Sequence, residues 1–131
     1  IDVAGAGGTS WSEVERYRHT TEPGARVAGA FAGWGLPTAE AIRQVRAALP
    51  NTPIIGSGGV RNGIDIAKCI ALGANLAATA RPALVPAVKE RGAEAVIEIL
   101  QTFLGELRVA MFCSGCADLA ALGRLELERL Q

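Results

Sequence analysis

The sequence contains little histidine, cysteine or methionine and shows no excess of either charge. Its 131 residues include one histidine, three cysteines and one methionine, and 13 basic side chains balance 13 acidic ones. Without a basic surplus, the composition argues against a protein that binds nucleic acid through its charge. No apolar run approaches the roughly 20 residues of a membrane-spanning helix, and no export signal is recognisable. These absences favour a globular, cytoplasmic protein without nucleic-acid or membrane partners.

Few residues are suited to bind a metal ion. Cys113 and Cys116 have the spacing of a redox or zinc motif, but a zinc site needs further ligands. His19, the one histidine, is distant in sequence and lies among polar residues, where we expect it to be solvated. We therefore interpret the cysteines as helix-end residues in a reducing compartment and predict no metal site within this chain.

What the sequence does contain is typical of one folded domain. Half of the residues are apolar and 16 are glycine, and the chain is long enough to bury a moderate core. The first residue, Ile1, already lies inside an apolar segment typical of a strand. We therefore expect the chain to be truncated at its N-terminus.

Three apolar segments are expected to form strands: residues 1–4, 54–57 and 75–80. Helical patterns alternate with them, which is typical of parallel strands joined by helical crossovers. A (β/α)8 barrel takes about 250 residues and eight strands. The sequence therefore predicts an α/β fold, the C-terminal part of a (β/α)8 TIM barrel, as a single unit over residues 1–131. We expect its open sheet edge to be unstable or to be covered by another copy.

The helices are expected to differ in length and clarity. In the clearest one, over 38–49, Arg43 and Arg46 are expected to face solvent. Residues 18–26, which include Pro23-Gly24, are predicted to be a mobile loop. The other helices are expected at 12–15 with a Ser12–Glu15 capping box, over 63–72, over 83–88, over 93–112 and over 117–130. The apolar face of the helix over 93–112 is expected to carry Val96, Ile97, Leu100, Leu104 and Leu107.

The most informative segment, residues 54–61, combines a short apolar strand with a glycine-rich turn and is followed by a helix. Gly58 and Gly59 leave backbone N–H groups accessible, and the helix N-terminus favours negative charge. The next strand ends at Ala80-Arg81. Because consecutive late strands of a barrel build one phosphate site, we predict a phosphorylated ligand. The alternatives are a purely structural tight turn at Gly58-Gly59 and an Arg81 that pairs with a surface acid.

Five segments carry a family resemblance: Ile-Asp-Val-Ala-Gly-Ala-Gly-Gly-Thr-Ser-Trp at 1–11, Trp-Gly-Leu-Pro-Thr at 34–38, Ser-Gly-Gly-Val-Arg at 57–61, Ala-Leu-Gly-Ala at 71–74 and Ala-Arg-Pro at 80–82. Together they resemble the C-terminal part of type 2 isopentenyl-diphosphate isomerase, and the resemblance covers the whole chain. The Gly-Gly-Thr-Ser-Trp and Trp-Gly-Leu-Pro-Thr segments are specific to that family. The later segments are shared by many FMN barrels.

The resemblance implies that FMN is held by its phosphate and ribityl tail. The residues that would touch it are Thr9, Gly59, Val60, Arg61, Ala80 and Arg81. It also implies a homo-oligomeric enzyme of isoprenoid biosynthesis that interconverts isopentenyl and dimethylallyl diphosphate, with Mg²⁺ and NADPH as further cofactors. The metal-binding and substrate-binding motifs of that family do not occur in this sequence. We therefore assign no catalytic residue and expect this chain alone to be inactive.

Several interpretations remain open. Thr9 is also suited to cap a helix, and Trp11 to pack rather than line a flavin or substrate pocket. An FMN-dependent 2-hydroxy-acid oxidase or dehydrogenase shares the late phosphate segments, but it needs a histidine base where this sequence has Ala4-Gly5-Ala6-Gly7. A non-catalytic half-barrel that binds phosphate and self-associates would also explain the absent strands.

Overall fold

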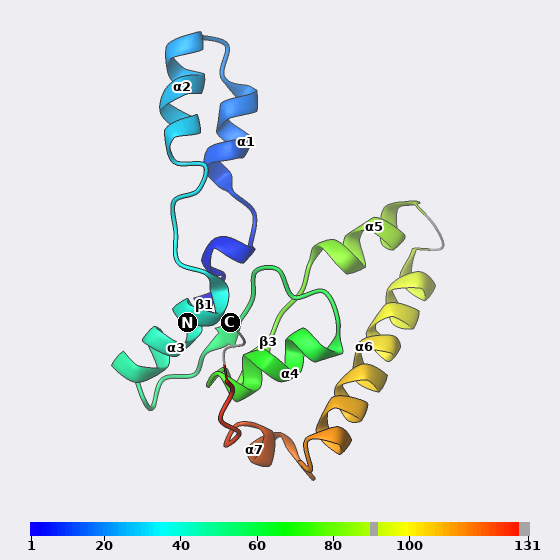
Figure 1. Ribbon diagram of the computed structural model, residues 1–131. Helices are drawn as coiled ribbons and strands as arrows, with labels where there is room; N and C mark the ends of the chain where they lie inside the picture. Colours follow the sequence, from blue (N-terminus) through cyan, green and yellow to red (C-terminus); the bar gives the residue numbers. More distant parts are fainter. Residues whose placement is uncertain (90–91, 129–131) are drawn as a thin grey trace.

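The computed structural model describes residues 1–89 and 92–128 and shows three short parallel strands with helical connections (Figure 1). The strands are β1 (Asp2–Val3), β2 (Ile55–Gly56) and β3 (Leu76–Ala77). They lie in the order β1-β2-β3, and Ile55 pairs with both Asp2 and Leu76. The predicted strands and their parallel order are confirmed, although each is shorter than expected.

The helices that join and follow the strands are α1 (Trp11–Arg18), α2 (Glu22–Ala30), α3 (Thr38–Ala48), α4 (Gly63–Ala71), α5 (Arg81–Lys89), α6 (Ala93–Cys113) and α7 (Leu119–Leu122), with a 3-10 turn η1 (Gly5–Gly7) after β1. The helices predicted over 38–49, 63–72, 83–88 and 93–112 are confirmed. Within the described residues, none of these helices is long and apolar enough to cross a membrane.

The core lies between the sheet and helices α3 and α4. Val3 of β1 packs with Ile42 of α3, Cys69 of α4 and Ile54, which directly precedes β2. Ile42 and Ile54 are completely buried. Complete burial of such a side chain contributes about 1.5–3 kcal/mol, so this cluster holds the sheet and the two helices together.

Helix α6 packs along α4, and α7 closes a second apolar cluster. Ala95 and Phe103 are the residues of α6 that are buried, whereas Ile97, Leu100 and Leu104 are 54%, 44% and 50% exposed. The apolar face expected for this helix is therefore confirmed only in part, because Leu107 packs against the second cluster and Val96 is half-buried. The helix predicted over 117–130 is confirmed only at Leu119–Leu122 and is wrong for 117–118 and 123–128, and residues 129–130 lie outside the described residues.

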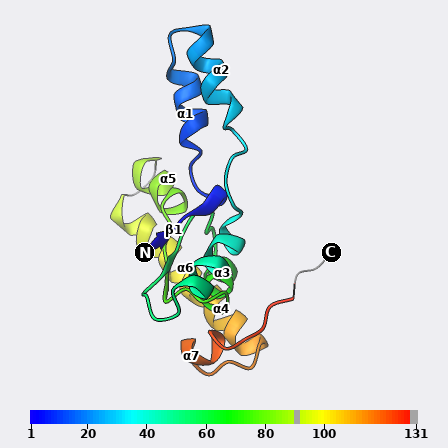
Figure 2. The same ribbon diagram turned by 90° about the vertical axis from the view of Figure 1, so that its left-hand side faces the viewer.

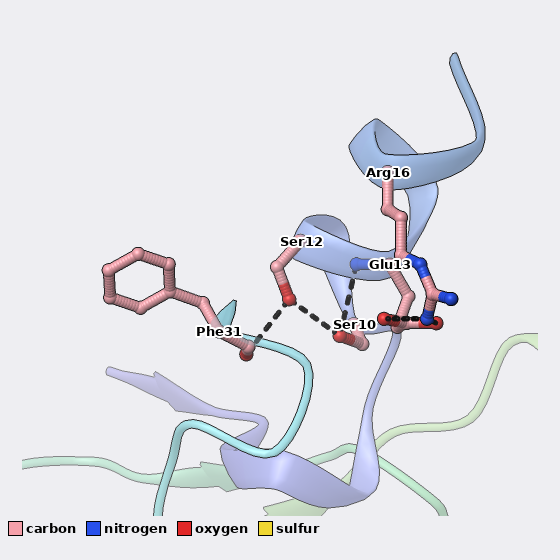
Figure 3. Close-up of polar contacts among 5 residues, drawn as sticks. All are labelled: Ser10, Ser12, Glu13, Arg16 and Phe31. Atoms are coloured by element: carbon pink, nitrogen blue, oxygen red, sulfur yellow. Dashed lines mark hydrogen bonds and ion pairs between the residues drawn. The ribbon is translucent and has the colours of Figure 1, made fainter. Parts of the chain in front are cut away.

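Helices α1 and α2 form a hairpin that projects from the sheet in both views (Figure 1 and Figure 2). The loop predicted over 18–26 is confined to 19–21, and the prediction is wrong for 22–26, because Pro23 lies in the first turn of α2, where its missing N–H costs nothing. The predicted capping box is also displaced. Ser10 caps α1 through Glu13 N, and the Ser12 hydroxyl donates to the Phe31 carbonyl at 3.0 Å (Figure 3).

Arg46 of α3 ties together the loops at the amino ends of β2 and β3. Its guanidinium donates to carbonyls of Pro50 and Thr52 at 2.7 and 3.0 Å. It also donates to the Gly73 carbonyl at 2.8 Å and to Asn75 Oδ1 at 2.7 Å. The prediction that Arg46 faces solvent is therefore wrong, because its planar guanidinium donates to several fixed acceptors in the loops that precede β2 and β3.

Candidate functional site

The loops that follow the three strands meet at the carboxyl edge of the sheet. We call residues 4–10 the first loop, 57–62 the second loop and 78–80 the third loop. Neighbouring parallel strands end at the same edge, so their loops lie together. Gly8 approaches Gly58, and the Thr79 hydroxyl donates to the Val60 carbonyl at 2.7 Å. The second loop therefore lies between the other two and touches both.

Gly58 and Gly59 shape the second loop through their backbone. Their φ angles are +78° and +82°, in the left-handed region that favours glycine. A Cβ on Gly58 would lie 1.9 Å from the Ala4 carbonyl oxygen, and one on Gly59 would lie 2.8 Å from the Gly7 oxygen. Both positions thus require glycine for conformation and for contact with the first loop.

Three successive carbonyl groups of the second loop accept hydrogen bonds from side chains. The Gly58 carbonyl accepts from Thr38 Oγ1 at 3.0 Å. The Gly59 carbonyl accepts from Arg61 Nε at 3.1 Å, and the Val60 carbonyl accepts from Thr79 at 2.7 Å. Among the described residues, the N–H groups of Gly58, Gly59 and Val60 have no hydrogen-bond partner. The loop therefore presents donors whose acceptor is still to be supplied, as an anion-binding loop requires.

Two arginines add positive charge near these donors. Arg61 belongs to the second loop, and Arg81 begins α5 directly after the third. Both are exposed, and neither forms an ion pair within the described part of the chain. With Nε of Arg61 bound to the Gly59 carbonyl, its two terminal nitrogens remain available for a ligand.

The N-terminus of α4 does not present the free N–H groups that the sequence predicted. The Gly63 N–H donates to Glu106 Oε2 at 2.6 Å, and the Asp65 N–H donates to Asn62 Oδ1 at 2.7 Å. The Arg61 N–H donates to Asp65 Oδ2 at 3.2 Å. These amides already have anionic or polar acceptors, so the free donors belong to the loop rather than to the helix end.

The residues expected to contact FMN lie in the three loops and at the start of α5, and they differ in how they are held there. Thr79 links Val60 to the third loop, which ends at Ala80. Thr9 follows Gly8 in the first loop and makes no side-chain hydrogen bond within the described residues. The cap of α1 is Ser10 rather than Thr9. Trp11 is 71% exposed, so it is not a packing residue in this structure.

A hollow of about 230 Å³ lies beside the second loop, between α3 and α4. Gly59, Val60 and Arg61 line it, whereas Thr9, Ala80 and Arg81 do not. Cys69, also on its wall, is buried, and burial together with the charge of Asp65 raises the pKa of this thiol. The thiol is therefore protonated at neutral pH and is no nucleophile. Within the described residues, no group of three or more histidine, cysteine or acidic side chains could hold a metal ion.

Thr38 and Thr79 bind carbonyls of the second loop, a role that the sequence motifs did not predict. Thr38 begins α3 after Pro37, and Thr79 is the one hydroxyl residue in the apolar segment 75–80. A hydroxyl residue near the end of an otherwise apolar run at 76–80 was a signal for a polar role of Thr79, although it did not identify the acceptor. Thr38 carried no such signal, because threonine at a helix start usually serves as a cap.

Comparison with known proteins gives two sets of relatives. An isopentenyl-diphosphate delta-isomerase of Stutzerimonas stutzeri strain A1501 is 48% identical over 130 residues, which are 99% of this chain and 37% of that protein. The enzyme of the same name from Mycobacterium marinum is 54% identical over 125 residues, 93% of this chain and 34% of that protein. The chain thus spans about a third of the length of these relatives.

Among solved structures, a lactate oxidase of Pediococcus acidilactici superposes with a TM-score of 0.67 at 26% identity, over 71% of this chain and 26% of the oxidase. A mandelate oxidase gives a TM-score of 0.66 at 31% identity, over 72% and 27%. These structures confirm the expected fold, part of a TIM barrel. The sequence model of the FMN-dependent dehydrogenases matches residues 33–129. The chain therefore belongs to the FMN-dependent dehydrogenase family, and its sequence is similar to isopentenyl-diphosphate delta-isomerases.

Proposed function

We propose that residues 1–131 form the C-terminal half of the flavin-binding barrel of an isopentenyl-diphosphate delta-isomerase, and that this half holds the FMN phosphate. The observation that carries the proposal lies in the second loop, where the N–H groups of Gly58, Gly59 and Val60 are free while the carbonyls of the same three residues are occupied. A dianionic phosphate is the kind of acceptor that such donors and two arginines favour, since charge-assisted hydrogen bonds are about twice as strong as neutral ones.

Each proposed contact follows from its place in the loops. Gly59 and Val60 offer backbone N–H groups, and Arg61 and Arg81 offer guanidinium charge. Thr9 would offer its hydroxyl, and Ala80 would contact the flavin tail through its backbone. Reduced FMN would supply a proton donor and acceptor at an allylic carbon, with no net redox change. These residues would anchor and orient the cofactor rather than react.

The remaining parts of the function would be supplied outside these residues. We propose that the complete enzyme is a cytoplasmic homo-oligomer of isoprenoid biosynthesis, with Mg²⁺ holding the substrate diphosphate and NADPH reducing the flavin. The similarity to isomerases over nearly the whole chain supports this proposal.

A 2-hydroxy-acid oxidase is the second candidate, because the solved structures of similar fold are oxidases. That chemistry needs a proton acceptor beside the flavin. The first loop has Ala4, Gly5, Ala6 and Gly7 after β1, and His19 lies in the turn between α1 and α2 against Gly24. The one histidine is therefore remote from the loops, which favours the isomerase.

The proposal is tested by titrating the chain with FMN and with riboflavin and following flavin fluorescence. We expect FMN to bind and riboflavin, which has no phosphate, to bind far more weakly. Arg61→Ala should weaken FMN binding by about 1.5–3 kcal/mol, the usual size of a charged hydrogen bond. Arg43→Ala is the matched control, because Arg43 is exposed on α3 and pairs with Glu40.

Equal affinity for the two flavins would contradict a phosphate site, and unchanged FMN affinity in Arg61→Ala would remove Arg61 from it. Gel filtration of the same sample distinguishes a single half-barrel from a self-associated one.

A further inference from the structure

We propose that Thr38 and Thr79 are positioning residues that hold the second loop in the conformation that receives the flavin phosphate. This inference rests on the proposed function and deepens it. Neither threonine is among the residues expected to touch FMN. They bind different carbonyls of the loop, Thr38 from the start of α3 and Thr79 from the third loop.

Thr38 connects three segments through one hydroxyl group. Its Oγ1 lies within donating distance of the Ala4 carbonyl at 2.6 Å and of the Gly58 carbonyl at 3.0 Å. The same oxygen accepts from the Gly7 N–H at 3.1 Å. Because a hydroxyl has one proton, the two carbonyls share it. The first loop, the second loop and α3 are thereby fixed to one another at a single half-buried atom.

Thr79 fixes the other end of the second loop. Its Oγ1 donates to the Val60 carbonyl at 2.7 Å, and the side chain is half-buried between β3 and the loop. Val60 itself is only 4% exposed. This bond therefore determines the point at which the loop leaves the core and Arg61 begins.

The orientation of each N–H group follows from the planarity of the peptide. In a trans peptide the carbonyl and the following N–H point in opposite directions. When Thr38 binds the Gly58 carbonyl, it turns the Gly59 N–H away from α3. When Arg61 Nε binds the Gly59 carbonyl, the Val60 N–H likewise points away from the group that binds this carbonyl. The Thr79 bond fixes the next peptide, whose N–H belongs to Arg61 and donates to Asp65, so it anchors the loop just after its free donors.

Such fixing matters because the loop is rich in glycine. Gly58 and Gly59 have no Cβ, so rotation of their peptides is opposed by little except these bonds. Donors that already point at the ligand need no reorganisation when it binds. Without the hydroxyl groups, the loop would have to be ordered by the phosphate itself, and affinity would fall.

The test compares valine with serine at each position. Thr38→Val and Thr79→Val keep the shape of the side chain and remove the hydroxyl, whereas Thr38→Ser and Thr79→Ser retain it. In the ligand-free chain, we expect the ¹⁵N order parameters of Gly58–Val60 to fall from rigid values to below about 0.6 in the valine variants. We expect the serine variants to stay rigid and to keep their FMN affinity. In the valine variants FMN affinity should fall about tenfold, with riboflavin affinity unchanged.

Thr102→Val is the control, because within the described residues the Thr102 hydroxyl donates to the Glu98 carbonyl of its own helix and to no part of the loops. Order parameters that do not change in the valine variants would overturn the inference, as would a loosened loop with undiminished FMN affinity. If Thr38→Val does not fold, Thr79→Val and the serine pair carry the test. A chain that binds no FMN contradicts the proposed function, whereas the order parameters measured without ligand still decide the role of the threonines.

Discussion

Gly58 is the residue at which backbone conformation and packing most clearly impose the same choice. Its φ of +78° is one that side chains other than glycine rarely adopt, and the missing Cβ leaves room for the Ala4 carbonyl. The first and second loops can approach one another only because this position has no side chain. The site therefore depends on Gly58 even though Gly58 was not expected to touch the ligand.

Gly58→Ala should lower the free energy of unfolding and abolish tight FMN binding. The left-handed backbone alone costs about 1–3 kcal/mol for a residue with a Cβ, and the contact with Ala4 adds to it. Gly33→Ala is the matched control, because a Cβ there meets nothing within 4 Å. Urea unfolding of the two variants measures the difference, and equal midpoints would contradict the argument.

For single residues, the sequence predicted those features that depend on neighbouring residues in the chain. Glycines after an apolar strand predicted the loop, because few other residues adopt such turns. The hydroxyls of Thr38 and Thr79 could not be assigned, because their acceptors come from other elements and depend on packing. The prediction of free N–H groups at the start of α4 was wrong for the same reason. The acceptor of the Gly63 N–H is Glu106, which lies on α6, far away in the sequence.

Among the elements, α3 carries two arginines whose surroundings differ, one bound to neighbouring loops and one exposed. Arg46 donates to fixed acceptors in the loops below the sheet, including the Gly73 carbonyl at 2.8 Å. Arg43 is exposed and lies 3.7 Å from Glu40 of the same helix. The two residues are three positions apart and differ in what the neighbouring loops offer them.

Arg46→Lys should therefore destabilise the chain by about 1.5–3 kcal/mol, because an ammonium cannot reach the several acceptors that a guanidinium fork joins. Arg43→Lys should change stability by less than about 0.5 kcal/mol, as is usual for exposed ion pairs. Thermal unfolding of both variants followed by circular dichroism measures the contrast. A similar melting temperature for the two would show that the Arg46 bonds contribute little.

Element types were predictable where the hydrophobic period was strong, as in α3, α4 and α6. The α1–α2 hairpin was not, because its second helix contains Pro23 and Gly24, residues that ordinarily indicate a loop. Proline is compatible with the first helical turn, a position that becomes apparent only when the helix start is known. The tail after α7 failed in the opposite sense, because its composition predicted a helix whereas Leu125 packs against the second apolar cluster from a non-helical segment.

For the whole molecule, the distribution of buried surface separates the sheet from the hairpin. Neither α1 nor α2 contains a buried residue, whereas α4 contains Gly63, Ala67, Cys69 and Ile70 in buried positions. Regions with few buried contacts open at a small fraction of the global unfolding free energy. The hairpin and the sheet should therefore behave as units of different stability.

Hydrogen exchange measured by mass spectrometry should show this directly. Peptides from 11–30 are expected to exchange long before peptides from 63–71, which report the core helix α4. The core peptide serves as the internal control for global unfolding. Equal protection of both regions would mean that the hairpin is held by contacts absent from this structure, as in a self-associated form.

The place where the hairpin joins the sheet has a consequence for how this fold tolerates change. The chain leaves near Ala6 and returns near Leu36, and the Ala6 N–H donates to the Leu36 carbonyl at 2.7 Å. That bond closes the segment at its base, so we expect the strands to keep their register when the α1–α2 hairpin is replaced. The hairpin is thus an exchangeable insert, and a reporter domain spliced in its place would sit next to the first loop.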